Sequence, residues 1–445
     1  MDSSKGTEFT NKLEDREIKE LKPYALRSKE RRESLKQQFR EYKTSRLEYR
    51  TEYQRDRDRI VWSKSFKRLQ HKTQIFPYYA QDHYRRRLTH SLEVAQIATT
   101  IARALKLNED ATEAISLGHD LGHTPFGHAG EAALNDILKD KGKKYSNNIV
   151  TPICGFNHCV HGIEVVSRIE QEYKSESNHP GLNLTFDTRD GILKHMHSRD
   201  SVDKKRPFSS ISKVVKFKSY KDFGNNKGSL EAQCVYFADK LAYLLSDIED
   251  GIRCDVLQCA DLAKEDFVKH IWAQYNEARE EHEDLKLDNI DDFLFFRRKA
   301  ITVLILNCID TSEKILKRKD FGSVDDVLSC QERIIYVDDR MERLWDEFYE
   351  KKIRNTFFND RRVVSCNYKA QKIIIDLFRA YFNKKELIPE DYRKATEKAY
   401  ELYIDRSDKE LLHLITVRNY IAGMTDPFAM NQHACLFTAL ERIQI

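Results

Sequence analysis

The chain has 445 residues, which allows one elaborated domain or two or three ordinary ones. Its 76 basic and 72 acidic side chains nearly cancel, and hydrophobic residues make up 40% of the sequence, which excludes wholesale disorder. Only 15 glycines and 8 prolines are present, and the glycine share is about half the usual ~7%. A chain this poor in turn residues cannot form many hairpins, so we expect an all-α fold.

The nine cysteines are scattered along the sequence without a CxxC pair. This distribution predicts reduced thiols rather than a disulfide framework or a zinc finger. The N-terminal stretch lacks the apolar segment of a signal peptide. Hydrophobic runs such as Ile301–Leu306 are much shorter than the roughly 20 residues of a membrane span. We therefore expect a cytoplasmic protein without a membrane partner.

Residues 1–60 are half charged, with apolar residues spaced as on helices that have a narrow apolar stripe. Between Leu21 and Arg50 there are ten basic and four acidic side chains. This basic arm is compatible with single-stranded nucleic-acid binding, while a solvated charged helix explains the same pattern. We predict a charged N-terminal helical region here.

The next region, residues 61–255, contains most of the histidines: eleven of fifteen lie between His71 and His197. Residues 88–107 have the apolar spacing of an amphipathic helix. Asn108 is placed to cap a second helix that runs towards His119.

A glycine-punctuated turn, residues 118–130, follows that helix, and helix is expected to resume at Glu131. Further helices are predicted over Leu230–Ile252 and throughout residues 256–445. Because no clean linker separates these parts, we expect one elaborated helical domain.

Four side chains form a candidate metal-ligand set: His90, His119, Asp120 and Asp239. Imidazole and carboxylate together suit Mn, Fe, Co, Ni, Zn or Mg. Taken alone, His90 is as readily explained as a core histidine, and a His-Asp pair occurs by chance. The glycine-rich turn that follows His119 and Asp120 adds two more histidines to the same segment, and burying so many polar groups for structure alone would be costly.

The predicted helix over Leu230–Ile252 carries Asp239, Tyr243 and Asp247 at i, i+4 and i+8, on one face. Lys240 lies beside Asp239 and could reach a phosphate bound at the same metal. The competing interpretation is an exposed charged stripe with an ordinary Asp-Lys neighbour pair.

The order His, His-Asp, Asp resembles the HD superfamily of metal-dependent phosphohydrolases, and most closely its deoxynucleoside triphosphate triphosphohydrolases, of which bacterial dGTPase is the type enzyme. The resemblance rests on these segments: Arg55–Ile60, Phe66–Leu69, Lys72–Phe76, Arg87–Val94, His119–Glu131, Phe156–His158, Leu182–Thr185, Ala238–Asp239, Asp247–Gly251 and Tyr420–Asp426. It implies an HD-domain helical core over residues 61–255, flanked by residues 1–60 and by a C-terminal helical region, 256–445, that completes the active-site wall and forms oligomer contacts.

The resemblance also implies an activity. The four ligands would hold a divalent metal, and water would attack the α-phosphorus of a dNTP, most simply dGTP, to release deoxynucleoside and tripolyphosphate. His128 would act as general acid, Glu131 would orient it, and His158 would lie at the phosphates. The implied substrate-binding residues are Gln74, Arg87, His123, Lys240, Tyr243 and Asp247. Among these, Tyr243 would lie against the deoxyribose.

The pattern departs from the family at four places: Thr124, Cys159 where asparagine is common, His195 and Asn419. None of them removes an implied metal ligand. The resemblance further implies a homo-oligomer, with a hexamer as the expectation, and admits an allosteric dNTP. Two other functions stay open: a different HD phosphohydrolase, acting on phosphodiesters or alarmones, and a single-stranded nucleic-acid-binding or regulatory protein with a vestigial site.

Overall fold

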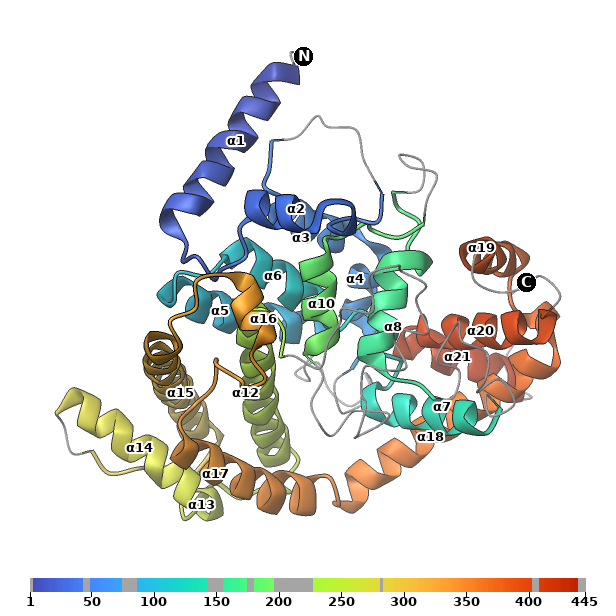
Figure 1. Cartoon of the computed structure of the whole chain (residues 1–445). Coiled ribbons are helices and arrows are strands. Elements are labelled where there is room, and N and C mark those ends of the chain that lie inside the picture. Colours follow the sequence, from blue (N-terminus) through green and yellow to red (C-terminus); the bar gives the residue numbers. More distant parts are fainter. Residues whose placement is uncertain are drawn as a thin grey trace.

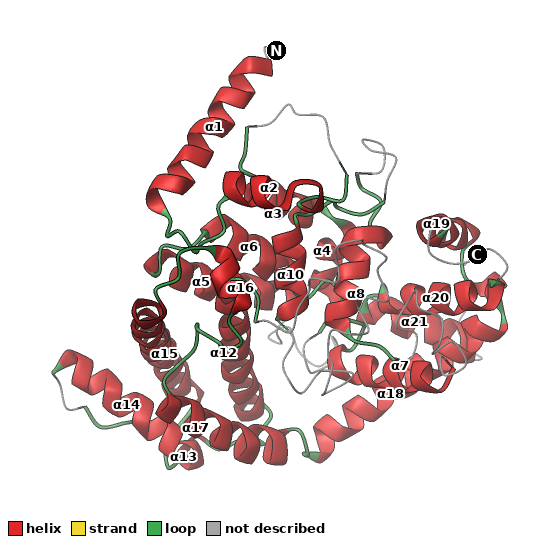
Figure 2. Ribbon diagram, viewed as in Figure 1, coloured by secondary structure: helices red, strands yellow, loops and turns green. Residues whose placement is uncertain are grey.

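The computed structural model describes residues 3–42, 49–73, 86–141, 155–173, 180–195, 227–280, 283–401 and 408–438. Within these ranges every regular element is helical (Figure 2), and the one β-bridge, between Thr73 and Arg86, is isolated. The predicted all-α fold is therefore confirmed. Gln74 lies outside the described residues.

The elements of the first half of the chain (Figure 1) are α1 (Ser3–Glu20), α2 (Ser28–Leu35), η1 (Lys36–Gln38), α3 (Glu52–Trp62), α4 (Lys64–Arg68), η2 (Leu69–His71), α5 (Arg87–Ala104), α6 (Glu109–Gly118), α7 (Gly127–Lys141), α8 (His158–Glu164), η4 (Val165–Ile169) and α10 (Phe186–Lys194). Those of the second half are α12 (Leu230–Arg253), α13 (Cys259–Leu262), α14 (Asp266–Arg279), α15 (Ile290–Lys319), α16 (Val324–Ser329), α17 (Asp339–Phe348), η6 (Tyr349–Phe357), α18 (Arg361–Asn383), η7 (Lys385–Leu387), α19 (Glu390–Tyr400), α20 (Lys409–Ala422) and α21 (Asp426–Phe437). None of the described helices meets the length and apolarity that a membrane crossing requires.

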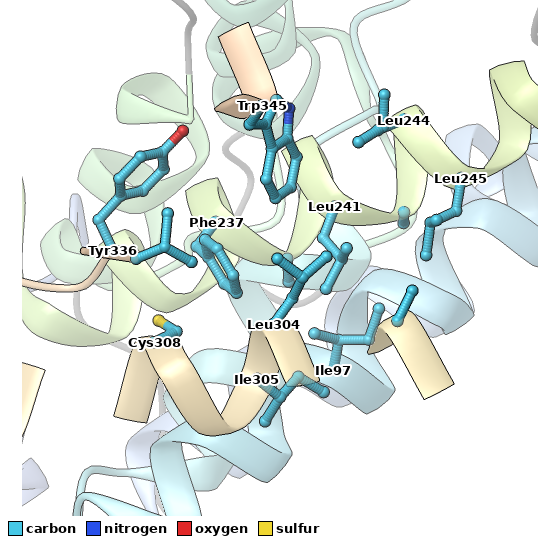
Figure 3. Packing of buried hydrophobic residues seen from close by; sticks show 14 of the residues in the cluster. Ile97, Phe237, Leu241, Leu244, Leu245, Leu304, Ile305, Cys308, Tyr336 and Trp345 are labelled. Carbon is cyan, nitrogen blue, oxygen red and sulfur yellow. The ribbon is translucent and has the colours of Figure 1, made fainter. Parts of the chain in front are cut away.

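Helix α12 is the central element of the main hydrophobic core. Its N-terminus is capped by Ser229, whose hydroxyl accepts a hydrogen bond from the Ala232 amide at 3.2 Å. The apolar face of α12 packs between α5 and α15 (Figure 3), with Phe237 and Leu241 fully buried. Trp345 from α17 covers the same cluster. This burial fixes the opposite, polar face of α12 towards the site.

The predicted helices around the histidine segment are confirmed with small shifts of their ends. Asn108 caps α6 by accepting from the Ala111 amide at 3.0 Å. Helix α7 begins at Gly127, one turn earlier than the predicted start at Glu131. Phe126 and Gly127 turn the chain between the two helices with φ of 61° and 56°.

The C-terminal helices are joined to this core partly through buried polar groups. Arg418 of α20 forms an ion pair with Glu164 at the end of α8, and the Tyr400 hydroxyl donates to the same carboxylate at 2.7 Å. Helix α18 packs along α7 (Figure 1). The boundaries predicted at residues 60 and 255 stay predictions.

Three arginines of the basic arm are engaged inside the protein. Arg31 pairs with Asp187, Arg32 with Glu14, and Arg40 with Glu52 and Asp56, at 2.6–2.7 Å. The described part of the arm therefore presents less unpaired positive charge than the residue counts indicate.

Candidate active site

The four predicted metal ligands converge from three helices. His90 lies in the first turn of α5, His119 and Asp120 directly follow α6, and Asp239 lies in α12. The Oδ1 atom of Asp239 is 2.9 Å from His90 Nε2 and 3.7 Å from His119 Nε2, and Asp120 Oδ1 is 3.4 Å from His119 Nε2. Atoms that share one ion at bond lengths of about 2.0–2.2 Å lie roughly 2.8–3.8 Å apart. The spacing of His90, His119 and Asp239 therefore fits a single divalent ion, with Asp120 next to His119.

The hydrogen bonds of His119 support this fit. Its Nδ1 donates to the Ser116 carbonyl at 2.6 Å, because a carbonyl can only accept. Its buried Nε2 has no hydrogen-bond partner, although two carboxylates lie close to it. Burial opposes protonation, yet Asp120 and Asp239 raise the pKa of His119 to about 9. Two buried carboxylates facing an imidazole nitrogen are the charge arrangement that a metal cation stabilises.

Asp120 also faces a second group of polar residues. Its Oδ2 atom accepts from Arg87 at 2.9 Å, and its Oδ1 atom lies 3.1 Å from His123 Nε2. The His123 ring is stacked on that of His158, with centroids 3.8 Å apart. Asp120 therefore lies between the predicted metal ligands and the predicted phosphate-binding residues.

Glu131 links the two remaining histidines. Its carboxylate lies 3.0 Å from His158 Nδ1, accepts from the His158 amide at 2.8 Å, and lies 3.3 Å from His128 Nδ1. Burial would raise the pKa of Glu131, but His158 and the histidine hydrogen bonds hold it well below its ordinary value. The pKa of His158 is raised, since Cys159 and Glu131 outweigh the effect of burial. His128 is half exposed and therefore accessible to solvent protons.

The position of His128 depends on a residue from the C-terminal region. Asp426 accepts hydrogen bonds from the Phe126 amide at 2.9 Å and from the Thr73 amide at 3.0 Å. It thereby holds the left-handed turn that leads into α7 and presents His128. The segment Tyr420–Asp426 belonged to the resemblance, but the sequence alone indicated no role for it.

Most of the convergent residues line a cavity of about 550 Å³. Its first side, the ligand wall, comes from α5, the turn after α6, α7, α8, α10 and α12, and comprises Arg87, His90, Asp120, His123, Phe126, His128, Ala129, His158, His195, Asp239, Lys240 and Tyr243. The remaining lining residues, the aromatic wall, are Tyr236 of α12 with Glu342, Trp345, Asp346, Tyr349, Phe358 and Asn367 of the later helices. The Tyr243 ring lies 6.2 Å from that of His128.

Four predicted site residues are not among those that line the cavity. His119 and Glu131 instead contact residues that do, Asp239 and His158 respectively. Asp247 is buried two turns beyond Asp239 on α12, and Gln74 lies outside the described residues. The predictions also missed most of the aromatic wall, such as Trp345 and Asp346, because these residues follow the ordinary apolar and charged pattern of a surface helix. His195 was recognised as a departure from the family but not as a site residue.

Sequence comparisons agree with this geometry. The HD domain model matches residues 87–244, and the phosphohydrolase-associated domain model matches residues 351–435. Proteins described as deoxyguanosinetriphosphate triphosphohydrolase-like are 36% identical in Bartonella tribocorum, 35% in Bartonella henselae and 36% in Brucella anthropi. Each alignment covers 87% of this chain and 90% of the relative. The chain belongs to this family of HD-domain phosphohydrolases.

Both matched segments contribute to the cavity. The HD match contains every residue of the ligand wall together with Tyr236. The associated-domain match begins within η6 and contributes Phe358 and Asn367, whereas Glu342, Trp345, Asp346 and Tyr349 lie between the two matches. HD domains bind divalent metal, and the grouping of His90, His119 and Asp239 around one point is consistent with that property.

Proposed function

We propose that this phosphohydrolase cleaves a deoxynucleoside triphosphate, with dGTP as the first candidate, into deoxynucleoside and inorganic tripolyphosphate. The observation that carries the proposal is the shared cavity. It is lined by His90 and Asp239 of the metal-capable set, by a solvent-accessible histidine held by a carboxylate, and by a tyrosine with a neighbouring lysine. A volume of about 550 Å³ lies within the range of roughly 300–1,000 Å³ that small-molecule sites occupy.

Mn²⁺ or Mg²⁺ is the first choice of ion for His90, His119, Asp120 and Asp239. When bound, the ion would supply Lewis acidity at the α-phosphate and would lower the pKa of a water molecule towards about 7. Arg87 keeps one face of Asp120 neutralised and has two further donor nitrogens without hydrogen-bond partners. A phosphate oxygen that enters the cavity can accept from them.

The leaving group in this reaction is the 5′ oxygen of the nucleoside. An alkoxide is a poor leaving group at neutral pH, so a proton must reach it as the bond to phosphorus breaks. His128 supplies this proton, and Glu131 holds the His128 ring through Nδ1. His158, held by the same carboxylate, is stacked on His123 beside the phosphates. Tyr243 lies close enough to His128 to contact the sugar of the same nucleotide.

We further propose a homo-oligomer, with a hexamer as the starting hypothesis, a cytoplasmic location, and activation by a second dNTP. The relatives are described as deoxyguanosinetriphosphate triphosphohydrolase-like proteins, and these names support the proposed substrate class. The walls of the cavity do not by themselves select among the four bases, so dGTP rests on the names of the relatives.

Product analysis by anion-exchange chromatography tests the proposal. Wild-type protein and a His119→Ala/Asp120→Ala variant are incubated with each dNTP, and with all four together, in Mn²⁺ or Mg²⁺. Tripolyphosphate and deoxynucleoside are expected from the wild type only. The mixture matters because it exposes an enzyme that needs a second nucleotide as activator.

Other products would point to the other functions. Release of monophosphate and pyrophosphate would mean cleavage at a different phosphorus bond. Hydrolysis of cyclic nucleotides or alarmones with dNTPs untouched would favour another HD phosphohydrolase. No product from any of these, together with salt-sensitive binding of single-stranded DNA that survives the double substitution, would favour a binding protein.

A further inference from the structure

A cysteine and two histidines converge beside the candidate metal site without belonging to it. Cys159 follows His158 at the start of α8, and His195 directly follows α10. The Sγ atom of Cys159 lies 3.3 Å from His158 Nε2 and 3.5 Å from His195 Nε2. All three side chains are buried. Two elements separated in sequence therefore bring three metal-ligating atoms to one point.

The contacts that each histidine makes through Nδ1 determine which nitrogen faces the sulfur. His195 Nδ1 donates to the Ile192 carbonyl, which can only accept, so its Nε2 carries the lone pair. His158 Nδ1 lies 3.0 Å from both oxygens of Glu131. A carboxylate or carbonyl behind the imidazole is the arrangement that orients histidines which ligate metals. Both Nε2 atoms are thus presented to the same sulfur.

The spacing of these atoms matches a tetrahedral zinc site. Bonds of about 2.3 Å to sulfur and about 2.0–2.1 Å to nitrogen place the two ligand atoms roughly 3.5–3.6 Å apart. The two sulfur–nitrogen distances of 3.3 and 3.5 Å are within a few tenths of an ångström of that value. A thiol proton alone accounts for only one of the two contacts, since it can be donated to a single nitrogen at a time.

We propose that Cys159, His158 and His195 bind a Zn²⁺ ion at a second metal site, distinct from the His/Asp set. Binding would release the thiol proton of Cys159 and the Nε2 proton of His158 to solvent, which leaves a thiolate and two neutral imidazoles as ligands. The fourth position of the ion faces the cavity, because both histidines line it. A water molecule or a phosphate oxygen would fill that position.

The two sets of ligand atoms prefer different metal ions. The His/Asp set offers nitrogen and oxygen only, which suits Mn²⁺ and Mg²⁺ as well as softer ions. The second set includes a thiolate, which selects Zn²⁺ and other thiophilic ions. The resemblance places asparagine commonly at the position of Cys159, and an amide cannot supply this sulfur ligand. The second site is therefore a property of this chain that the family does not imply.

Cobalt spectroscopy tests the proposal without relying on catalysis. The full-length metal-free protein is titrated with Co²⁺ alone, which gives a thiolate-to-cobalt charge-transfer band only when sulfur is a ligand. We expect this band in the wild type and in His119→Ala/Asp120→Ala, and its loss in Cys159→Ser. Cys435→Ser, which changes an exposed thiol, is the matched control and should keep the band.

A second readout protects the test against a variant that fails to fold. After dialysis against Zn²⁺ and then metal-free buffer, we expect two retained ions per wild-type chain and one per chain of His195→Gln. Glu131→Gln removes the carboxylate charge behind both His158 and His128 and should weaken Zn²⁺ binding at this site by about 10–100-fold. Circular dichroism verifies that each variant is folded. Absence of the charge-transfer band in the wild type, or its persistence in folded Cys159→Ser, would overturn the proposal.

Discussion

The two walls of the cavity are built in different ways. The ligand wall is polar and converges from six separate segments, with its side chains held by hydrogen bonds such as that of Arg87 to Asp120. The aromatic wall comes mainly from one continuous stretch, α17 to the start of α18, and its anchor Trp345 is fully buried. The first wall fixes atoms for chemistry, whereas the second provides surface for the rest of the substrate.

The supports behind the walls differ in the same way. Behind the ligand wall, the buried Lys72 donates to the His123 and Ala422 carbonyls, and Asp426 holds the turn before His128. Behind the aromatic wall, Trp345 packs against Phe237 and Phe267, with ring centroids 6.2 and 5.9 Å apart. A polar support responds to pH and charge, and an apolar support responds to lost volume. Substitutions in each wall can therefore distinguish the polar support from the apolar support.

The largest effect is expected from His128→Asn on the ligand wall. Removing a general acid costs about 10²–10⁴-fold in rate, so kcat should fall towards the upper end of that range while KM changes little. His128 is half exposed, so the fold should tolerate the substitution. Steady-state tripolyphosphate release with the preferred dNTP measures both constants.

A substrate whose leaving group needs no proton provides the control for this prediction. With 4-nitrophenyl triphosphate, the departing nitrophenolate is weakly basic, and the difference between wild type and His128→Asn should shrink strongly. An equal loss on both substrates would mean that His128 does not donate the proton.

A substitution in the aromatic wall should mainly lower the stability of the fold. Trp345→Ala removes a fully buried indole, and the free energy of unfolding should fall by about 3–5 kcal/mol. Trp62→Ala is the matched control, because Trp62 is 65% exposed and surface changes usually stay within about 0.5 kcal/mol. Urea denaturation followed by circular dichroism compares the two. Equal losses of unfolding free energy in the two variants would contradict the role of Trp345 as an apolar support.

The contrast between the walls also explains what the sequence could predict. His90, His119, Asp120 and Asp239 were predictable because few residue types ligate metal and their order along the chain is distinctive. Helix types and the Asn108 cap followed from local spacing. These features depend on nearest neighbours or on chemistry that ordinary surfaces do not need.

The aromatic wall could not be predicted in the same way. Trp345 and Phe358 are separated from the histidines by more than a hundred residues, and nothing in their local pattern distinguishes a cavity wall from an ordinary core. The role of Asp426 was hidden for a similar reason, since its partners Phe126 and Thr73 lie some 300 and 350 residues away. Such contacts are set by how α17, α18 and α21 pack, which depends on the whole fold.

The contribution of the polar support to the free energy of unfolding should depend on pH, whereas that of the apolar support should not. Burial lowers the pKa of Lys72 from its ordinary 10.5 to about 7. Between these values the unfolded chain binds more protons than the folded chain, so the free energy of unfolding contributed by this group rises with pH. From pH 7 to 9 the wild type should gain up to about 3 kcal/mol relative to Lys72→Met.

Urea denaturation at pH 6, 7, 8 and 9 measures this difference, which should be flat below pH 7. The exposed Lys64→Met variant should stay parallel to the wild type over the whole range. A constant difference between wild type and Lys72→Met at every pH would show that Lys72 is not buried as a titrating amine.

The smallest effects are expected where the walls meet, at Lys240. Its Nζ donates to the Tyr336 hydroxyl and to Asp346 at 3.1 Å, and it lies over the Trp345 ring. If Lys240 neutralises phosphate charge, Lys240→Gln should raise KM about tenfold with little change in kcat, because one charge-assisted hydrogen bond contributes about 1.5–3 kcal/mol. Asp346→Asn should act in the opposite direction and lower KM by a smaller factor, since it removes a negative charge that competes with phosphate for the same ammonium group. Initial-rate measurements over a range of dNTP concentrations distinguish the two variants. A rise of KM in both would mean that the pair acts as a structural unit of the aromatic wall, with Lys240 held away from the substrate.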